Sequence, residues 1–372
     1  MVAGTLLAAL AGPAALAQEE PRNLPPPPPQ LAPSPVVHSD RRVTFRLFAP
    51  KADKVAVNGD FNGHKTLELG KEKRGLWTVT VGPLKPNLYE YLFLVGGRLV
   101  LDPRNDQIRP GNQPTSLLEV PGPKPMLWEP RDVPHGTVHV HWYASAELGK
   151  PRRLHVYTPP GYERGRKSYP TLYLLHGSGG TDADWVVAGR VNFILDNLLA
   201  EGKVVPMVVV MPMGHPLRDA AASMAVYDKG WSFERELPRN VLPLVEKTYR
   251  VKTDPGSRAI AGVSMGGGQA LDVAGRNLDR FAWVGAFSPG NTGPVLYHVQ
   301  SNPRPLNDKL RLLWIACGKD DSLYKENKAL IAALEKEGIK HVWRPTVGAH
   351  TWSVWRDYLS EFAPLLFRPA DH

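Results

Sequence analysis

Cysteine is nearly absent from this sequence: Cys317 is the single one among 372 residues. An internal disulfide framework is therefore excluded. Cys317 ends the apolar run Leu312–Cys317, which predicts a buried, packed side chain rather than a reactive thiol. No run after the N-terminus reaches the roughly 18–20 apolar residues that a membrane-spanning helix needs, so no span is expected.

Runs of like charge are also missing. The formal net charge is +9, but it is spread along the chain, so we expect a generally basic surface and no nucleic-acid binding. The H-E-x-x-H and P-loop motifs and a strand-placed G-x-G-x-x-G are absent. His139 and His141 share one face of a strand without a carboxylate or third histidine beside them. We therefore expect neither a metal nor another cofactor.

Proline and glycine, by contrast, are abundant at 37 and 34 residues, which indicates many turns and linkers. The chain is longer than one hydrophobic core usually organises, so two domains are expected. Residues 1–17 are predicted to be a signal peptide, because an apolar stretch ends in Ala15-Leu16-Ala17. The protein is therefore expected to be secreted or periplasmic. Residues 18–36, with five consecutive prolines, are predicted to form a stiff linker.

Residues 37–121 contain short alternating strands separated by turn residues, which predicts an all-β sandwich. The stretch Val57–Gly63, followed by Gly75-Leu76-Trp77, Tyr89-Glu90-Tyr91 and Asp102–Asn105, resembles the immunoglobulin-like modules of carbohydrate-binding family 48. His64 stands where an aromatic residue often follows the Asn-Gly pair. Because starch binding uses stacked aromatics, a structural or substrate-flanking role is the better prediction. We expect the module to pack near the mouth of the active site.

After a connector at residues 122–135, residues 136–369 alternate apolar strands with amphipathic helices. The strands expected are Leu154–Thr158, Thr171–Leu175, Met207–Met211, Ala259–Val263, Trp283–Phe287, Leu310–Cys317 and Val342–Pro345. Continuous Val/Ile/Leu runs between helices predict a mainly parallel sheet buried on both faces.

The strongest chemical signal is a G-x-S-x-G sequence centred on Ser264, between a buried strand and a helix. Flanking glycines let a serine sit on a strained turn as an exposed nucleophile. Such a serine needs a histidine as general base and a carboxylate to orient it. His350 is the histidine downstream of Ser264 that falls in a loop between the last strand and the last helix. Asp320 and Asp321, which follow the preceding strand, are both candidates for the acid.

The negative charge formed during attack on a carbonyl requires backbone N–H donors. We expect one from Met265, directly after the nucleophile. The second is expected from Ser178, in the glycine-rich loop His176–Gly180. Gly177 of this loop is expected to contact the substrate, because glycines let the backbone approach it closely. Trp185 and Trp352 are candidates for an apolar wall around an aromatic acyl group, with core packing as the alternative for each.

Residues 136–367 resemble the esterase D-like family, carbohydrate esterase family 1, and in particular its feruloyl esterases. The stretches that carry this resemblance are Tyr157–Tyr162, Tyr173–Gly177, Asp196–Lys203, Ala261–Ala270 and Ile315–Gly318. The resemblance implies an α/β-hydrolase fold and a triad of Ser264, Asp321 and His350, which favours Asp321 over Asp320.

The function expected is that of a serine esterase acting on feruloylated or acetylated xylan, with the feruloyl ester preferred. An enterochelin-type siderophore esterase is the second possibility, since that group also joins a β module to this fold. A carbohydrate-binding protein without catalytic activity is the third, and the complete triad argues against it.

Overall fold

The computed structural model describes residues 33–216, 232–293, 295 and 304–368. The predicted signal peptide and most of the predicted linker lie outside these residues. Within the described part of the chain, no helix combines the length and the apolar character needed to cross a bilayer.

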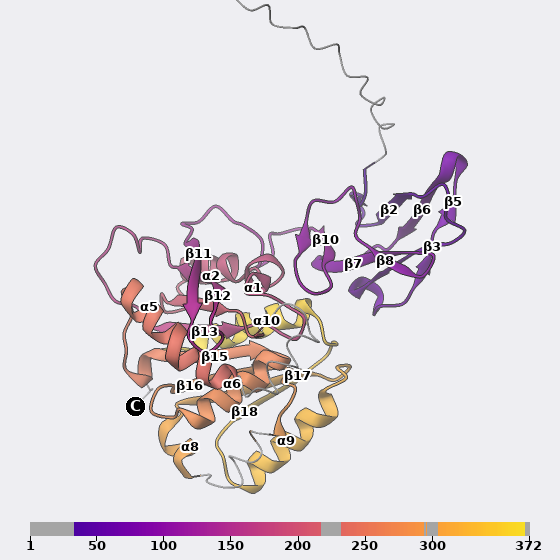
Figure 1. Cartoon of the computed structure of the whole chain (residues 1–372). Coiled ribbons are helices and arrows are strands. Elements are labelled where there is room, and N and C mark those ends of the chain that lie inside the picture. The colour runs from indigo at the N-terminus through magenta and orange to yellow at the C-terminus, as the bar shows by residue number, and fades with distance from the viewer. Residues whose placement is uncertain (1–32, 217–231, 294, 296–303, 369–372) are drawn as a thin grey trace, which may run out of the picture. The chain divides into compact units, whose positions relative to one another are not determined.

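The N-terminal segment folds as two β-sheets that face each other across an apolar core (Figure 1). One sheet has the order β1 (Val36–Val37), β2 (Val43–Phe48), β6 (Leu76–Val81) and β5 (Gly70–Lys71). The other has the order β4 (Leu67–Glu68), β3 (Val55–Gly59), β7 (Asn87–Val95), β10 (Thr115–Val120) and β9 (Ile108–Arg109), and β8 (Arg98–Val100) pairs with β7. Phe45, Tyr91 and Phe93 point into the core from both sheets. The predicted sandwich is present.

The sandwich begins a few residues before the predicted boundary. The buried Ser34 hydroxyl donates a 2.6 Å hydrogen bond to Asp102, and Val36 pairs with Thr44 of β2. Residues 33–36 therefore belong to the module rather than to the linker.

The C-terminal segment is built on one eight-stranded sheet. Its order is β11 (Thr137–Ser145), β12 (Lys150–Thr158), β14 (Val208–Pro212), β13 (Thr171–Leu175), β15 (Arg258–Val263), β16 (Trp283–Phe287), β17 (Leu312–Gly318) and β18 (Val342–Thr346). β11, β12 and β14 pair antiparallel, and the strands from β14 to β18 pair in parallel. Every residue of β13, β14 and β16 is buried, as expected for strands covered on both faces.

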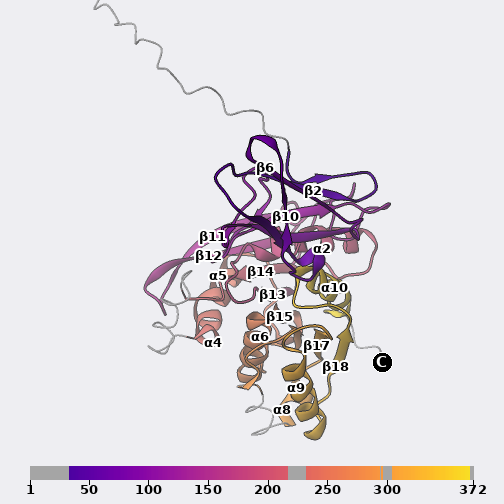
Figure 2. The same cartoon turned by 90° about the vertical axis from the view of Figure 1, so that its right-hand side faces the viewer.

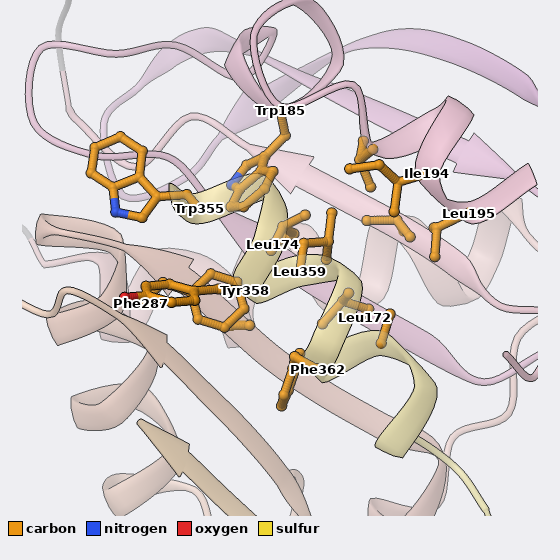
Figure 3. Packing of buried hydrophobic residues seen from close by; sticks show 14 of the residues in the cluster. Leu172, Leu174, Trp185, Ile194, Leu195, Phe287, Trp355, Tyr358, Leu359 and Phe362 are labelled. Carbon is orange, nitrogen blue, oxygen red and sulfur yellow. The ribbon is translucent and has the colours of Figure 1, made fainter. Parts of the chain in front are cut away.

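Helices cover both faces of this sheet (Figures 1 and 2). α1 (Asp184–Val187), α2 (Val191–Ala200) and α10 (Trp352–Phe362) pack in one core cluster. α4 (Phe233–Glu236), α5 (Leu242–Thr248), α6 (Met265–Arg276), α8 (Arg304–Lys309) and α9 (Tyr324–Lys336) pack in the other. Figure 3 shows α10 placing Tyr358, Leu359 and Phe362 against Leu172 of β13 and Phe287 of β16. This packing fixes the start of α10, just after His350.

The larger core extends beyond the predicted hydrolase boundary. Leu88 and Leu117 of the sandwich and Trp128 of the predicted connector are buried in the same cluster as α2 and α10. Trp128 therefore anchors the predicted connector in the core that supports the eight-stranded sheet.

Candidate active site

Ser264 lies on a sharp turn between β15 and α6. Its φ of 53° and ψ of −120° are outside the regions that a serine ordinarily adopts. The flanking glycines make the turn possible: a Cβ on Gly262 would lie 2.4 Å from the Gly266 carbonyl oxygen, and one on Gly266 would lie 2.4 Å from that of His176. The turn is held because the Ser264 N–H donates to the Phe287 carbonyl at 2.9 Å. The predicted strand, glycine-flanked serine and helix are thus assembled as a nucleophile elbow.

Ser264 and His350 line one cavity of about 140 Å³. Gly177, Ser178 and Trp352, three further residues singled out from the sequence, line the same cavity. The structure therefore brings the serine, the histidine and the glycine-rich loop to one point at the carboxyl ends of the parallel strands.

His350 is paired with Asp321, its Nδ1 lying 2.8 Å from Asp321 Oδ2. Asp321 is buried, and its other oxygen accepts the Leu323 N–H at 2.8 Å. Burial by itself would raise the pKa of Asp321, but the hydrogen bonds from His350 and Leu323 outweigh it and hold the pKa below its usual value. A charged Asp321 suits a histidine that carries its proton on Nδ1 and leaves Nε2 free as a base.

Asp320, the other candidate acid, has a different environment. It is exposed, and its carboxylate accepts the Gly348 N–H at 3.3 Å. Of the two neighbouring aspartates, Asp321 is the one that contacts the histidine. Asp320 instead ties the loop after β17 to the loop that carries His350.

The predicted oxyanion donors lie beside the serine. Met265 is the first residue of α6, so its N–H has no partner inside the helix. Gly177 packs so closely that a Cβ there would lie 3.3 Å from Ser264 Cβ. Ser178 is exposed on the cavity wall.

Two buried histidines hold the glycine-rich loop. His176 Nδ1 donates to the Gly177 carbonyl at 2.7 Å, and its Nε2 accepts the Gly214 N–H at 2.8 Å. His215 Nε2 accepts the Gly179 N–H at 2.9 Å. Burial lowers the pKa of both His176 and His215 to about 4, so both act as neutral acceptors. Sequence reasoning missed the role of His215, because nothing in its neighbourhood resembles a motif.

The predicted tryptophans take different positions. Trp352 lines the cavity, whereas Trp185 is buried, donates its indole N–H to the Leu175 carbonyl at 2.9 Å and is absent from the cavity lining. Trp185 packs edge-on behind Trp352, with ring centroids 5.1 Å apart. The core-packing alternative therefore describes Trp185, and direct substrate contact does not. Trp355, which the sequence did not single out, lines the cavity and lies edge-on to His350 with centroids 4.8 Å apart; Figure 3 shows Trp185 and Trp355.

Two charged residues of the β sandwich, which the sequence analysis did not single out, also line the cavity that holds Ser264 and His350. They are Glu90 of β7 and Arg109 of β9. Arg109 forms an ion pair with Glu90 and a longer one, at 3.4 Å, with Asp184 of α1. Burial raises the pKa of Asp184 to about 6, although Arg109 opposes the shift.

A second cavity of about 500 Å³ adjoins the first. Glu90, Arg109 and Ser178 line both. Its wall includes Asn58 and His64 of the family 48 motif. The loop after β9 is held against the glycine-rich loop, because the Asn112 N–H donates to the Gly179 carbonyl at 2.9 Å.

His139 and His141, which share a strand face, have protein partners. His139 contacts the Thr158 hydroxyl at 3.1 Å and Glu163 at 3.4 Å, and His141 contacts the Tyr249 hydroxyl.

Comparison with known proteins agrees with this architecture. The Esterase family model matches residues 145–366, and that of carbohydrate-binding module 48 (isoamylase N-terminal domain) matches residues 33–104. The chain is 30% identical over 341 residues to an endo-1,4-beta-xylanase/feruloyl esterase of Xylanibacter ruminicola, covering 90% of this chain and 46% of that protein. It therefore spans less than half of that curated relative.

Solved structures show the same fold. A ferulic acid esterase superposes with a TM-score of 0.55 at 28% identity, covering 62% of this chain and 97% of the other. The enterobactin esterase FES from Shigella flexneri superposes with a TM-score of 0.68 at 21% identity, covering 89% and 94%. The predicted α/β-hydrolase fold, preceded by a β module, is confirmed. The chain belongs to the esterase family, and its N-terminal segment matches the model of carbohydrate-binding module 48.

Proposed function

We propose that this protein is an exported feruloyl esterase that removes feruloyl groups from arabinoxylan through a Ser264–His350–Asp321 triad. The observation that carries the proposal is the 2.8 Å contact between His350 and Asp321, in a cavity that also exposes Ser264. A serine on an elbow, a histidine and a buried carboxylate are the parts that acyl transfer needs.

In the proposed mechanism, Ser264 Oγ attacks the ester carbonyl while His350 Nε2 takes its proton. The resulting oxyanion accepts hydrogen bonds from the N–H groups of Met265 and Ser178. His350 then gives the proton to the departing sugar oxygen, and the acyl group remains on Ser264. Water, deprotonated by His350, releases the acid in the second half of the reaction. No metal or organic cofactor takes part.

The aromatic side chains of the cavity support an aromatic acyl group. Trp352 and Trp355 form an apolar part of the wall next to the histidine, and flat rings pack well edge-on or offset against indoles. The relationship to a xylanase/feruloyl esterase supports the same substrate class. The adjoining cavity on the β module is suited to the polysaccharide that bears the ester, and the predicted signal peptide supports export to it.

Acetylated xylan and a catecholate siderophore are the competing substrates. An acetyl group is too small to need the indole wall, and the resemblance to the enterobactin esterase is one of fold. A protein that only binds carbohydrate would have no use for the paired His350 and Asp321.

A panel of natural esters tests the proposal: methyl ferulate, feruloylated arabinoxylan oligosaccharides, acetylated xylan and a catecholate siderophore. We expect hydrolysis of both feruloyl esters to exceed that of the other two. Ser264→Ala should fold normally and retain less than about a tenth of the activity, because only binding and the oxyanion donors remain. Preferred hydrolysis of acetylated xylan or of the siderophore would refute the feruloyl assignment, and substantial activity of the alanine variant would refute the nucleophile.

A further inference from the structure

The β module contributes a charged pair to the wall of the catalytic cavity. Glu90 and Arg109 line that cavity together with Ser264 and His350, although they lie some 150 residues or more before the serine in the sequence. Their side chains are only 17% and 14% exposed. Charged side chains that are largely withdrawn from water need partners, so the polar contacts of this pair define what it can still bind.

Glu90 has one carboxylate oxygen engaged and one available, whereas Arg109 has two nitrogens engaged and one available. Glu90 Oε1 accepts from Arg109 Nε and from the Thr115 hydroxyl, the latter at 2.6 Å. Arg109 Nη1 donates to Asp184 and to the Pro110 carbonyl, both at 3.4 Å. Among the described residues, Glu90 Oε2 and Arg109 Nη2 have no hydrogen-bond partner, and neither atom is sealed from solvent.

This arrangement offers one acceptor and one donor side by side. The protein contacts hold both side chains in a fixed orientation, which reduces the entropy lost when a ligand binds. Glu90 Oε2 can accept a hydrogen bond from a hydroxyl group, and Arg109 Nη2 can donate one to an ether or hydroxyl oxygen. The matching ligand is a hydroxyl group with a second oxygen on the neighbouring carbon.

We propose that Glu90 and Arg109 form a specificity-determining pair in which the β module recognises two adjacent oxygens of the ester substrate. This inference rests on the proposed function. Adjacent oxygens occur on the ring of a hydroxy-methoxy aromatic acid and on a sugar, and the pair lies at the junction of the two cavities, where either source can reach it. The recognised chemistry is the same for both, and substrate comparison distinguishes them.

The test compares Glu90→Gln and Arg109→Lys with wild type on three esters. Methyl ferulate carries the ring oxygens, methyl cinnamate lacks them, and a feruloylated arabinoxylan oligosaccharide adds the sugar. Hydrogen bonds to charged groups contribute enough to change kcat/KM by roughly tenfold or more. Arg109→Lys keeps the charge but loses the fork of donors, so it tests the geometry without removing the cation.

If the pair binds the oxygens of the aromatic ring, kcat/KM of both variants falls about tenfold on methyl ferulate, while kcat/KM on methyl cinnamate is unchanged. If the pair binds the oxygens of the sugar, kcat/KM falls only on the feruloylated oligosaccharide. Glu119→Gln is the matched control, because Glu119 forms a 3.6 Å ion pair with Arg190 between the module and the hydrolase domain and lines neither cavity. This control should keep the wild-type ratios between substrates.

Equal losses on all three esters would overturn the proposal and leave the pair a purely structural role. The proposed function fails separately, if wild-type enzyme prefers acetylated xylan over feruloyl esters. In that case the two variants are compared with wild type on an acetylated xylan oligosaccharide and an aryl acetate instead of the feruloyl esters. If the ratio of kcat/KM values for these two substrates is the same in the variants as in wild type, Glu90 and Arg109 do not recognise the substrate.

Discussion

The backbone N–H of Gly179 donates a 2.9 Å hydrogen bond to Nε2 of His215, while the Gly179 carbonyl accepts from Asn112 of the β module. Both backbone groups of this glycine are therefore held, next to the proposed oxyanion donor Ser178. Misplacing such a donor by about an ångström costs up to roughly a hundredfold in rate. We therefore expect the orientation of this loop to determine kcat.

We expect His215→Ala to reduce kcat by about tenfold or more with little change in KM, because the oxyanion forms only in the transition state. His215→Gln, which supplies another acceptor, should recover part of the loss. Steady-state kinetics on methyl ferulate check this. If the glutamine and alanine variants are equally slow, the acceptor at position 215 has no role in positioning the loop.

The low pKa of His215 also predicts how stability depends on pH. In the unfolded chain this histidine takes up a proton near pH 6.5, whereas in the folded protein it stays neutral until about pH 4. The unfolded state thus binds more protons between these values, and the contribution of His215 to stability falls as the pH drops from 6.5 to 4.

Glutamine does not titrate, so the stability lost in His215→Gln should be largest at pH 7 and should shrink towards pH 4. Burial raises the pKa values of Asp60 and Asp184 to about 7 and about 6, so their contributions to stability change with pH in the opposite direction. These contributions are common to wild type and His215→Gln, so they cancel in the difference between the two proteins. Thermal unfolding of both proteins at several pH values measures the difference. A difference in Tm that is constant across this range contradicts the assignment of a neutral His215.

The two neighbouring aspartates should respond very differently to substitution. Asp321→Asn removes the charge that fixes the tautomer of His350, and losses of about 10⁴-fold in kcat follow from such a change in a serine triad. Asp320→Asn alters an exposed contact to the Gly348 N–H and should change kcat only a few-fold. Both variants need only an aryl ester assay. Comparable losses would mean that Asp321 is not the acid of the triad.

Much of the hydrolase fold could be predicted from the sequence because its signals are local. The runs Thr171–Leu175 and Trp283–Phe287 are strands with the predicted limits, since a continuous apolar run between helical segments describes a buried parallel strand. The turn at Ser264 could be recognised in the sequence because the glycines that it requires, Gly262 and Gly266, lie within two residues of the serine. β11 was less visible, as its exposed edge position leaves Val140 and Trp142 facing solvent.

The features that could not be predicted depend on contacts between distant segments. Glu90 and Arg109 lie in strands whose alternation is explained by the sandwich alone, and nothing nearby in sequence points to Ser264. The same holds for Trp128, which is buried with α2 and α10 although its segment has the composition of a linker. Local patterns identify elements, but they do not show which face of the module the hydrolase covers.

Arg356 connects the module to α10, the helix that follows His350. It is fully buried in α10 and donates to the Asn87 side chain at 2.6 Å, to the Leu88 carbonyl at 2.8 Å and to the Ala188 carbonyl at 2.6 Å. Burial lowers the pKa of Arg356 to about 10, against the opposing effect of Asp60, so the guanidinium stays charged at neutral pH. One side chain thereby satisfies acceptors on β7 and next to α1.

Arg356→Leu should destabilise the protein by roughly 3–5 kcal/mol, because the buried backbone carbonyls of Leu88 and Ala188 lose a charged hydrogen-bond donor. Arg344→Leu is the control. Arg344 of β18 forms an ion pair with Glu361 of α10 at the surface, where an ion pair contributes about 0–1 kcal/mol to stability. Urea unfolding followed by tryptophan fluorescence measures both. Because α10 begins two residues after His350, the Arg356 variant should also lose kcat under conditions where it remains folded. A loss of stability as small as that of the control would show that the module and α10 do not depend on this contact.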